Sequence, residues 1–268
     1  MQKHKLNTAF TWGDHKGPFR AVTAAQAREY DQDGFFVVED AFAPETIAGL
    51  LAELDPLEAE FEKFLREKLG GKAFIARADE ITFNVHAVLR SPAARAFTLD
   101  PVFRDLAYDL LGPNVRLYWD QTVYKKPGTA ERFPWHQDNG YTYVEPQQYL
   151  TCWVALTDAD EETGCPVLAP GVHRGGTLAH ETTDLGFQCF AASPAGAVAV
   201  PLRAGSIAVF SSLTPHMTGP NLSADHERKA YIVQYAPDGA QVLRADQRTP
   251  CDAPDRQYPI LVNGDSPA

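Results

Sequence analysis

Cysteine is scarce in this sequence. The 268 residues hold four cysteines, no two of which form a CxxC pair: Cys152, Cys165, Cys189 and Cys251. Scattered cysteines in a chain of this length argue against the disulfide framework of small secreted domains. We expect reduced thiols, buried as small hydrophobic side chains, and therefore a cytoplasmic protein.

Long apolar runs and a secretory signal are also missing. No apolar stretch approaches the ~18 residues that a membrane-spanning helix needs. Residues 1–7 lack the apolar region of a signal peptide. We therefore expect no membrane partner.

Basic residues are fewer than acidic residues. The chain has 24 Lys and Arg against 35 Asp and Glu, a formal net charge of -11. Domains that bind nucleic acid usually carry a basic patch, and the sequence shows none, so nucleic acid is not an expected partner. The hydrophobic content of 44% is close to that of an ordinary globular chain. We treat residues 1–268 as a single domain.

Residues 1–114 are expected to form a mainly helical part, which begins with an irregular arm over residues 1–20. Thr23 is a suitable N-cap for a short helix, because its hydroxyl can accept a bond from a free backbone N–H. Gly34 ends this helix. Residues 35–38 are all Phe or Val and predict a short strand.

Three further helical stretches follow in this part of the chain. Residues 44–54 and 57–69 carry apolar side chains at helical spacing. Pro56 lies between them and is expected to separate two helices, because proline interrupts the helical hydrogen bonds. Residues 91–111 predict two more helices, with a break at Asp100 before Pro101.

After residue 114 the predicted secondary structure changes from helices to short strands. The runs are rich in β-branched and aromatic residues, and Gly and Pro punctuate them: 115–124, 149–156, 197–201, 206–210 and 230–235. This pattern predicts a mainly β core over residues 115–236, a sandwich or barrel with helices packed outside. The polar, Pro-rich tail over residues 237–268 is expected to be extended coil.

The sequence Trp135-His136-Gln137-Asp138 places a histidine and a carboxylate two residues apart. On a β-strand, alternate residues point to the same face, so His136 and Asp138 would project together about 7 Å apart, at ~3.3 Å per residue. Imidazole and carboxylate are a common pair of ligands for first-row metals. A second histidine would complete the facial triad that suits non-haem Fe(II).

His216 is the best candidate for the second histidine. It follows the apolar strand expected over residues 206–210 and comes directly after Pro215. Twelve residues later, Arg228 opens the next apolar strand. A buried arginine is costly unless it meets an anion, and its planar fork suits a carboxylate. The combination is much more specific than the His-x-Asp pair alone.

These motifs resemble the phytanoyl-CoA dioxygenase family of Fe(II)/2-oxoglutarate oxygenases. The resemblance is carried by five stretches: Asp33–Val38, Trp135–Asp138, Thr151–Leu156, Gly164–Arg174 and Pro215–Arg228. It implies a double-stranded β-helix (jelly roll, cupin-like). It also implies an oxidoreductase that hydroxylates a small molecule with O2 and 2-oxoglutarate as cosubstrates, and succinate and CO2 as co-products.

The resemblance also implies roles for the metal ligands. His136, Asp138 and His216 would hold Fe(II) and form the catalytic centre. Halogenating relatives replace the carboxylate with a small residue, which frees a metal position for chloride. Asp138 is present here, so the family pattern favours hydroxylation.

Five residues are expected to bind the cosubstrate by this resemblance. Arg228 would pair with the distal carboxylate of 2-oxoglutarate, Thr218 could add a hydroxyl, and Trp153 matches a residue that lines the pocket. Gln121 and Lys125 share one face of the expected strand over residues 115–124, and the family often uses polar residues of this strand.

Substrate contacts are expected from residues near the metal motif. Asn139, Tyr141 and Tyr143 follow it directly, and Asn84 lies in the region where such folds build a lid. The family serves acyl-CoA, amino acids, phosphonates and carrier-bound natural products, so the motifs do not select a substrate. We expect a monomer or a homodimer.

Two other functions are compatible with parts of this pattern. A metal-dependent, cupin-like isomerase or lyase would keep the metal triad but would not need Arg228. A catalytically silent binding module would need neither, and the complete ligand set argues against it.

Overall fold

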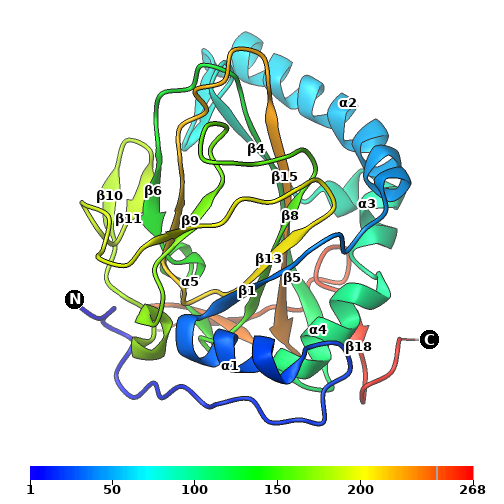
Figure 1. Ribbon diagram of the computed structural model, residues 1–268, viewed down its shortest axis with the longest axis vertical. Coiled ribbons are helices and arrows are strands. Elements are labelled where there is room, and N and C mark those ends of the chain that lie inside the picture. The colour runs from blue at the N-terminus through cyan, green and yellow to red at the C-terminus, as the bar shows by residue number, and fades with distance from the viewer. Residues whose placement is uncertain (246, 268) are drawn as a thin grey trace.

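The computed structural model describes residues 1–245 and 247–267, and it is built around two facing β-sheets (Figure 1). The main sheet has nine strands with antiparallel neighbours. In spatial order they are β1 (Phe35–Val38), β13 (Ile207–Ser211), β8 (Leu150–Ala155), β15 (Arg228–Pro237), β5 (Val115–Lys125), β4 (Ile81–Val85), β3 (Ala76–Arg77) and β2 (Lys72–Ala73), with β18 (Pro259–Leu261) also paired to β5.

The second sheet has four strands and faces the inner side of the main sheet. Its order is β12 (Val198–Ala199), β9 (Pro166–Leu168), β14 (His216–Thr218) and β6 (Phe133–His136). Smaller pairings add β10 (Glu181–Thr183) with β11 (Gly186–Gln188), and β7 (Val144–Glu145) with β16 (Gln241–Arg244) and β17 (Gln247–Pro250). This arrangement confirms the predicted mainly β, jelly-roll fold.

Helices cover the outer face of the main sheet. They are α1 (Ala24–Asp33), α2 (Pro44–Leu69), α3 (Pro92–Phe97) and α4 (Pro101–Leu111), while the short α5 (Asp138–Tyr141) lies between the sheets. Short 3-10 turns occur at Ala87–Leu89 and Val172–Gly175. No helix in the described ranges is long and apolar enough to cross a bilayer.

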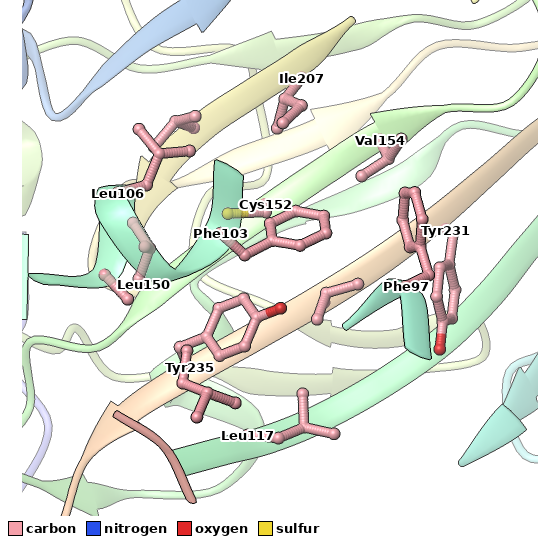
Figure 2. Close-up of a cluster of buried hydrophobic side chains, with 14 of the residues drawn as sticks. Phe97, Phe103, Leu106, Leu117, Leu150, Cys152, Val154, Ile207, Tyr231 and Tyr235 are labelled. Carbon is pink, nitrogen blue, oxygen red and sulfur yellow. The ribbon is translucent and has the colours of Figure 1, made fainter. Parts of the chain in front are cut away.

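Strand alternation divides the core into an outer and an inner layer. On β8, Cys152 and Val154 point outward and pack with Phe103 of α4 (Figure 2). Trp153 of the same strand belongs to the inner cluster, between the sheets. Because both faces of β8 are covered, the strand is buried throughout, and its inward side chains are available to build a site.

Several predicted elements are confirmed. Thr23 caps α1 in a capping box with Gln26, and Gly34 ends it in the left-handed conformation with φ 89°. The helices after residue 91 break at Asp100, as expected.

Other predicted elements differ from the structure. Pro56 does not separate two helices; it lies inside the single helix α2, because its exposed ring faces solvent while the apolar stripe packs on the sheet. The tail is not simply coil, since β16, β17 and β18 lie in it. Residues 1–114 contribute strands β1 and β4 to the main sheet as well as helices.

Candidate metal centre and cavity

The two histidines of the predicted triad face each other across the second sheet. His136 ends β6, His216 begins β14, and their Cα atoms are register partners in the antiparallel pair. Their ring centroids lie 4.2 Å apart. Each Nδ1 is 2.8–3.0 Å from a backbone carbonyl oxygen, that of Pro134 for His136 and of Thr214 for His216. An Nδ1–H donated to each carbonyl leaves both Nε2 lone pairs free for a ligand.

Asp138 completes the triad from a different element than predicted. It does not continue the strand of His136; it begins the short helix α5, because the chain turns at Gln137 as it leaves the sheet. Its Oδ1 lies 3.8 Å from Nε2 of His136 and 3.7 Å from Nε2 of His216. The turn therefore brings the carboxylate to both imidazoles.

The three donor groups fit a divalent first-row metal. Their ligand atoms all lie within 4.8 Å of one another. Burial and the nearby His216 hold the pKa of His136 well below its ordinary value, so its imidazole is neutral at pH 7 and can donate a lone pair. Two imidazole nitrogens and one carboxylate oxygen on one side of an ion are the donor set of non-haem Fe(II) sites.

Thr151 orients the carboxylate, and the sequence pattern did not identify it. Its hydroxyl donates a 2.6 Å hydrogen bond to Oδ2 of Asp138 from the inner face of β8. This bond occupies one carboxylate oxygen and leaves Oδ1 directed at the imidazoles. Alternation along the predicted strand over residues 149–156 was the available signal, because it places Thr151 on the same face as Trp153.

Arg228 is fully buried at the start of β15, and no carboxylate of residues 1–245 or 247–267 forms an ion pair with it. Its Nη1 donates to the carbonyl oxygen of Val123 at 3.3 Å. Among the described residues, its Nε and Nη2 have no hydrogen-bond partner, and neither does the buried hydroxyl of Thr218. A buried guanidinium with two free donor atoms is costly unless an anion meets it. These donors fit the carboxylate of a bound ligand.

Lys125 and Trp153 lie beside this guanidinium. Lys125 is the register partner of Arg228, and its Nζ donates to the carbonyl oxygens of Gly219 at 2.5 Å and Glu131 at 3.1 Å. Burial and the charge of Arg228 lower the pKa of Lys125 to about 6. The indole of Trp153 has its ring centroid 5.3 Å from the guanidinium carbon. The structure thus brings the main predicted cosubstrate residues together.

A cavity of about 420 Å³ opens beside the metal ligands. His136 and Asp138 line its inner end, and Gln121 and Tyr141 of the predicted site also line it. Half of the side chains that line it are aromatic. This size and apolar character are typical of a small-molecule site.

Three predicted substrate residues do not reach this cavity. Asn139 is fully buried, and its amide bonds to the Thr177 hydroxyl and the backbone N–H of Val144. Tyr143 stacks on His4 of the N-terminal arm, with ring centroids 4.7 Å apart.

Asn84 points to the other side of the main sheet. Its register partner on β5 is Thr122, whose hydroxyl donates to Glu58 of α2. Asn84 therefore lies on the face that α2 covers, while its neighbours Phe83 and Val85 line the cavity.

Comparison with known proteins finds sequence similarity to dioxygenases. The chain is 31% identical over 158 residues to an ectoine dioxygenase of Bordetella parapertussis, a match that covers 58% of this chain and 50% of the relative. It is 25% identical over 241 residues to a probable alpha-ketoglutarate-dependent hypophosphite dioxygenase of Stutzerimonas stutzeri, covering 82% and 81%. The chain thus spans about half the length of the ectoine dioxygenase that it matches.

Among solved structures, the fold is similar to SnoK, a non-heme alpha ketoglutarate dependent carbocyclase from nogalamycin biosynthesis. The TM-score is 0.67 at 25% identity, over 92% of this chain and 94% of that one. The phytanoyl-CoA dioxygenase (PhyH) family model matches residues 30–230, most of the chain. Together with the His-Asp-His site and the jelly-roll core, this match places the chain in the phytanoyl-CoA dioxygenase family.

Proposed function

We propose that the protein is an Fe(II)- and 2-oxoglutarate-dependent dioxygenase that hydroxylates a small molecule, with succinate and CO2 as co-products. The observation that carries this proposal is the pairing of a complete two-histidine, one-carboxylate site with a buried arginine on the adjacent sheet, whose Nε and Nη2 find no partner in the described part of the chain. The metal site alone is common to many reactions. The arginine adds a receptor for a carboxylate.

His136, Asp138 and His216 would hold the iron. When bound, the metal supplies the activation of O2 that the side chains of a protein lack. The protein's own part is to fix the ligands: two backbone carbonyls set the imidazoles, and Thr151 sets the carboxylate. With three ligands from the chain, the other side of the ion is free for cosubstrates.

Arg228 would bind the distal carboxylate of 2-oxoglutarate. Its Nε and Nη2 supply two parallel donors, the arrangement that an arginine uses for bidentate recognition. The Thr218 hydroxyl and Nζ of Lys125 would add further donors to the same anion, and Trp153 would cover the guanidinium with its ring.

Hydroxylation is the favoured outcome because Asp138 occupies the third ligand position. A cupin-like isomerase or lyase would share the metal ligands but would have no use for a buried cation at Arg228. The unpartnered guanidinium therefore supports the oxygenase over this alternative. It also argues against a silent binding module.

The proposal extends to the setting of the enzyme. All four cysteines are free thiols, which supports a reducing, cytoplasmic location. We propose a monomer or homodimer that acts on a small molecule, with no nucleic-acid partner.

A succinate-release screen tests the proposed function. Fe(II), 2-oxoglutarate and O2 are supplied, and succinate is measured against a panel of metabolites. The wild type should release succinate above background with at least one compound, and the Asp138→Ala variant should release none. Succinate release that is equal in both proteins would contradict the proposal.

A further inference from the structure

The cavity beside the metal site has aromatic walls that begin at a metal ligand. On one side, ring centroids step from His136 to Tyr141 at 5.2 Å, to Phe187 at 4.9 Å and to Phe74 at 6.1 Å. These spacings are those of edge-to-face and tilted ring packing. The wall thus leads from the reacting centre outward.

A second aromatic series lines the same cavity and also begins at His136. Phe133 lies 4.9 Å from His136, and Phe83 lies 5.3 Å from Phe133, again between ring centroids. Trp119 also lines the cavity. A flat ring in this cavity would find aromatic surfaces to pack against, and ring-on-ring contact adds to the gain from burial alone.

The mouth of the cavity is apolar and is built by two hairpins. Phe74 lies at the tip of the β2–β3 hairpin and is 62% exposed, and Phe187 lies on β11. Arg77 ties the hairpins together, since its Nη2 donates to the carbonyl oxygen of Asp184 at 2.8 Å and its Nη1 to that of Phe74 at 3.2 Å.

Phe74 is the first residue of the two-residue turn between β2 and β3, a position where hairpin turns take a positive φ. Its φ of 49° is in the left-handed region, which a bulky side chain rarely adopts. Val85, which also lines the cavity, is 44% exposed. Large apolar side chains left exposed around one opening mark a surface that an apolar ligand covers.

The lining of the cavity offers no cation to a charged substrate, and Arg77 at the mouth uses both of its Nη groups on backbone carbonyl oxygens. Among the lining residues in the described part of the chain there is no Lys or Arg, and the acidic one is the metal ligand Asp138. The charge of a bound Fe(II) would be matched by Asp138 and one carboxylate of the cosubstrate, because the other carboxylate would pair with Arg228. A carboxylate or phosphate placed farther out would lose hydration without gaining a partner.

Two amides supply neutral polar contacts. Gln121 accepts a bond from the Trp119 indole N–H at 3.1 Å, which leaves its NH2 group as a donor. Gln234 donates to Thr151 at 3.3 Å, which leaves its carbonyl oxygen as an acceptor. Such groups orient hydroxyl, carbonyl or amide functions of an uncharged ligand.

We propose that the primary substrate is a neutral, ring-containing small molecule, packed against the aromatic lining and oriented by Gln121 and Gln234. This inference rests on the proposed function, because it places the substrate against the metal ligands of an oxygenase. It narrows the substrate class and disfavours acyl-CoA, phosphonates and other anions.

A pair of probes with the same ring system tests the charge preference. Binding of naphthalene-2-carboxamide and naphthalene-2-carboxylate is measured by calorimetry on the protein loaded with Fe(II) and 2-oxoglutarate without oxygen. The carboxamide should bind at least about tenfold tighter, since the carboxylate finds no cation. Equal binding, tighter binding of the carboxylate or of decanoyl-CoA, or no binding of the carboxamide overturns the proposal.

Arginine substitutions test whether the preference for the neutral probe arises in this cavity. Val85→Arg adds a cation at the mouth and should raise affinity for the carboxylate at least several-fold. Val198→Arg makes the same change at a similarly exposed position on β12, outside the cavity, and should leave both affinities unchanged. Phe74→Ala should weaken carboxamide binding by roughly 3- to 10-fold through lost ring contact. An equal response to both arginine variants would contradict this placement.

The same samples separate this inference from the proposed function. If 2-oxoglutarate itself fails to bind in the calorimeter, the oxygenase proposal fails. If 2-oxoglutarate binds and the probes show no preference for the neutral ring, only the substrate inference fails.

Discussion

At the residue scale, the hydrogen bond from Thr151 to Asp138 sets the orientation of the carboxylate relative to the two histidines. The bond ties Oδ2 and leaves Oδ1 facing both histidines. Groups that hydrogen-bond a metal ligand typically contribute 10- to 100-fold to metal affinity. We therefore predict that Thr151→Val, which keeps the side-chain shape, weakens Fe(II) binding by roughly 10- to 100-fold. Competition with a chelator under anaerobic conditions measures this affinity.

A matched control isolates the hydroxyl of Thr151. Thr182→Val makes the same substitution at an exposed position on β10 and should leave Fe(II) affinity unchanged. If both variants bind Fe(II) like the wild type, the orienting role assigned to Thr151 is wrong.

The chemically distinctive residues of the site could be predicted from the sequence. His136, Asp138, His216 and Arg228 stand out because their side chains are costly to bury without a ligand or a partner. Thr151 could not be selected in the same way. Its role depends on the placement of β8 opposite α5, and no local pattern encodes that long-range contact.

At the element scale, the long helix α2 continues through a proline. Pro56 lies inside it and is exposed, so its replacement leaves no cavity. An interior proline removes one helical hydrogen bond and costs up to about 3 kcal/mol relative to alanine. We predict that Pro56→Ala raises the free energy of unfolding by about 1–3 kcal/mol, measured by urea denaturation.

Pro44 provides the control for this prediction. It occupies the first turn of the same helix, where no hydrogen bond is lost. Pro44→Ala should therefore give no comparable gain. A gain for Pro44→Ala as large as for Pro56→Ala would show that helix geometry is not the cause.

The junction between α1 and β1 depends on glycine. A Cβ on Gly34 would lie 2.5 Å from the Thr214 hydroxyl and 2.6 Å from Nδ1 of His173, at a φ of +89°. Gly34→Ala should lower the free energy of unfolding by at least about 2 kcal/mol, through backbone strain and the steric clash together. Chemical denaturation measures the difference.

Gly239→Ala is a control that distinguishes the cost of backbone strain from the cost of the steric clash. Its φ is +86°, yet nothing lies within 4 Å of an added Cβ, so Gly239→Ala should cost only the backbone part, about 1–2 kcal/mol. Equal losses for Gly34→Ala and Gly239→Ala would contradict the importance of the contact with His173.

Elements with strong local signals were predictable, and those set by tertiary contacts were not. The capped helix α1 and the apolar strands β5 and β8 follow from residue type and spacing. The tail strand β18 is a short apolar run between polar stretches; it pairs with an edge that β5 leaves free, and Ile260 and Leu261 enter the core. The helical turn at Asp138 likewise reflects the end of β6 rather than its own residues.

At the scale of the whole molecule, two basic side chains, those of Lys125 and Arg228, lie buried side by side. Lys125 is 1% exposed, and burial and Arg228 lower its pKa to about 6, against about 10.4 in an unfolded chain. Between these values the unfolded state holds a proton that the folded state lacks, so folding stability rises with pH. The protein without ligands should gain about 1.4 kcal/mol per pH unit from this group between pH 7 and 8.

Substitution of Lys125 by methionine tests this assignment. Urea unfolding at several values between pH 7 and 8, above the ordinary range of histidine, should show the slope reduced by about one proton. Burial alone would lower the pKa of the neighbouring Lys126, but its ion pairs with Glu227 and Glu62 raise it on balance. Lys126→Met should therefore keep the wild-type slope, and an unchanged slope in Lys125→Met would refute the assignment.

The proposed function joins an iron site, held by His136, Asp138 and His216, to a receptor for 2-oxoglutarate at the buried Arg228. Anaerobic titration of the Fe(II)-loaded protein with 2-oxoglutarate tests it most directly, through the visible charge-transfer band of an α-keto acid chelated to Fe(II). The wild type should develop a saturable band, and Arg228→Met should need roughly 100-fold more 2-oxoglutarate to reach it, because a buried charge pair is lost. No band in the wild type, or equal titrations of both proteins, would contradict the account.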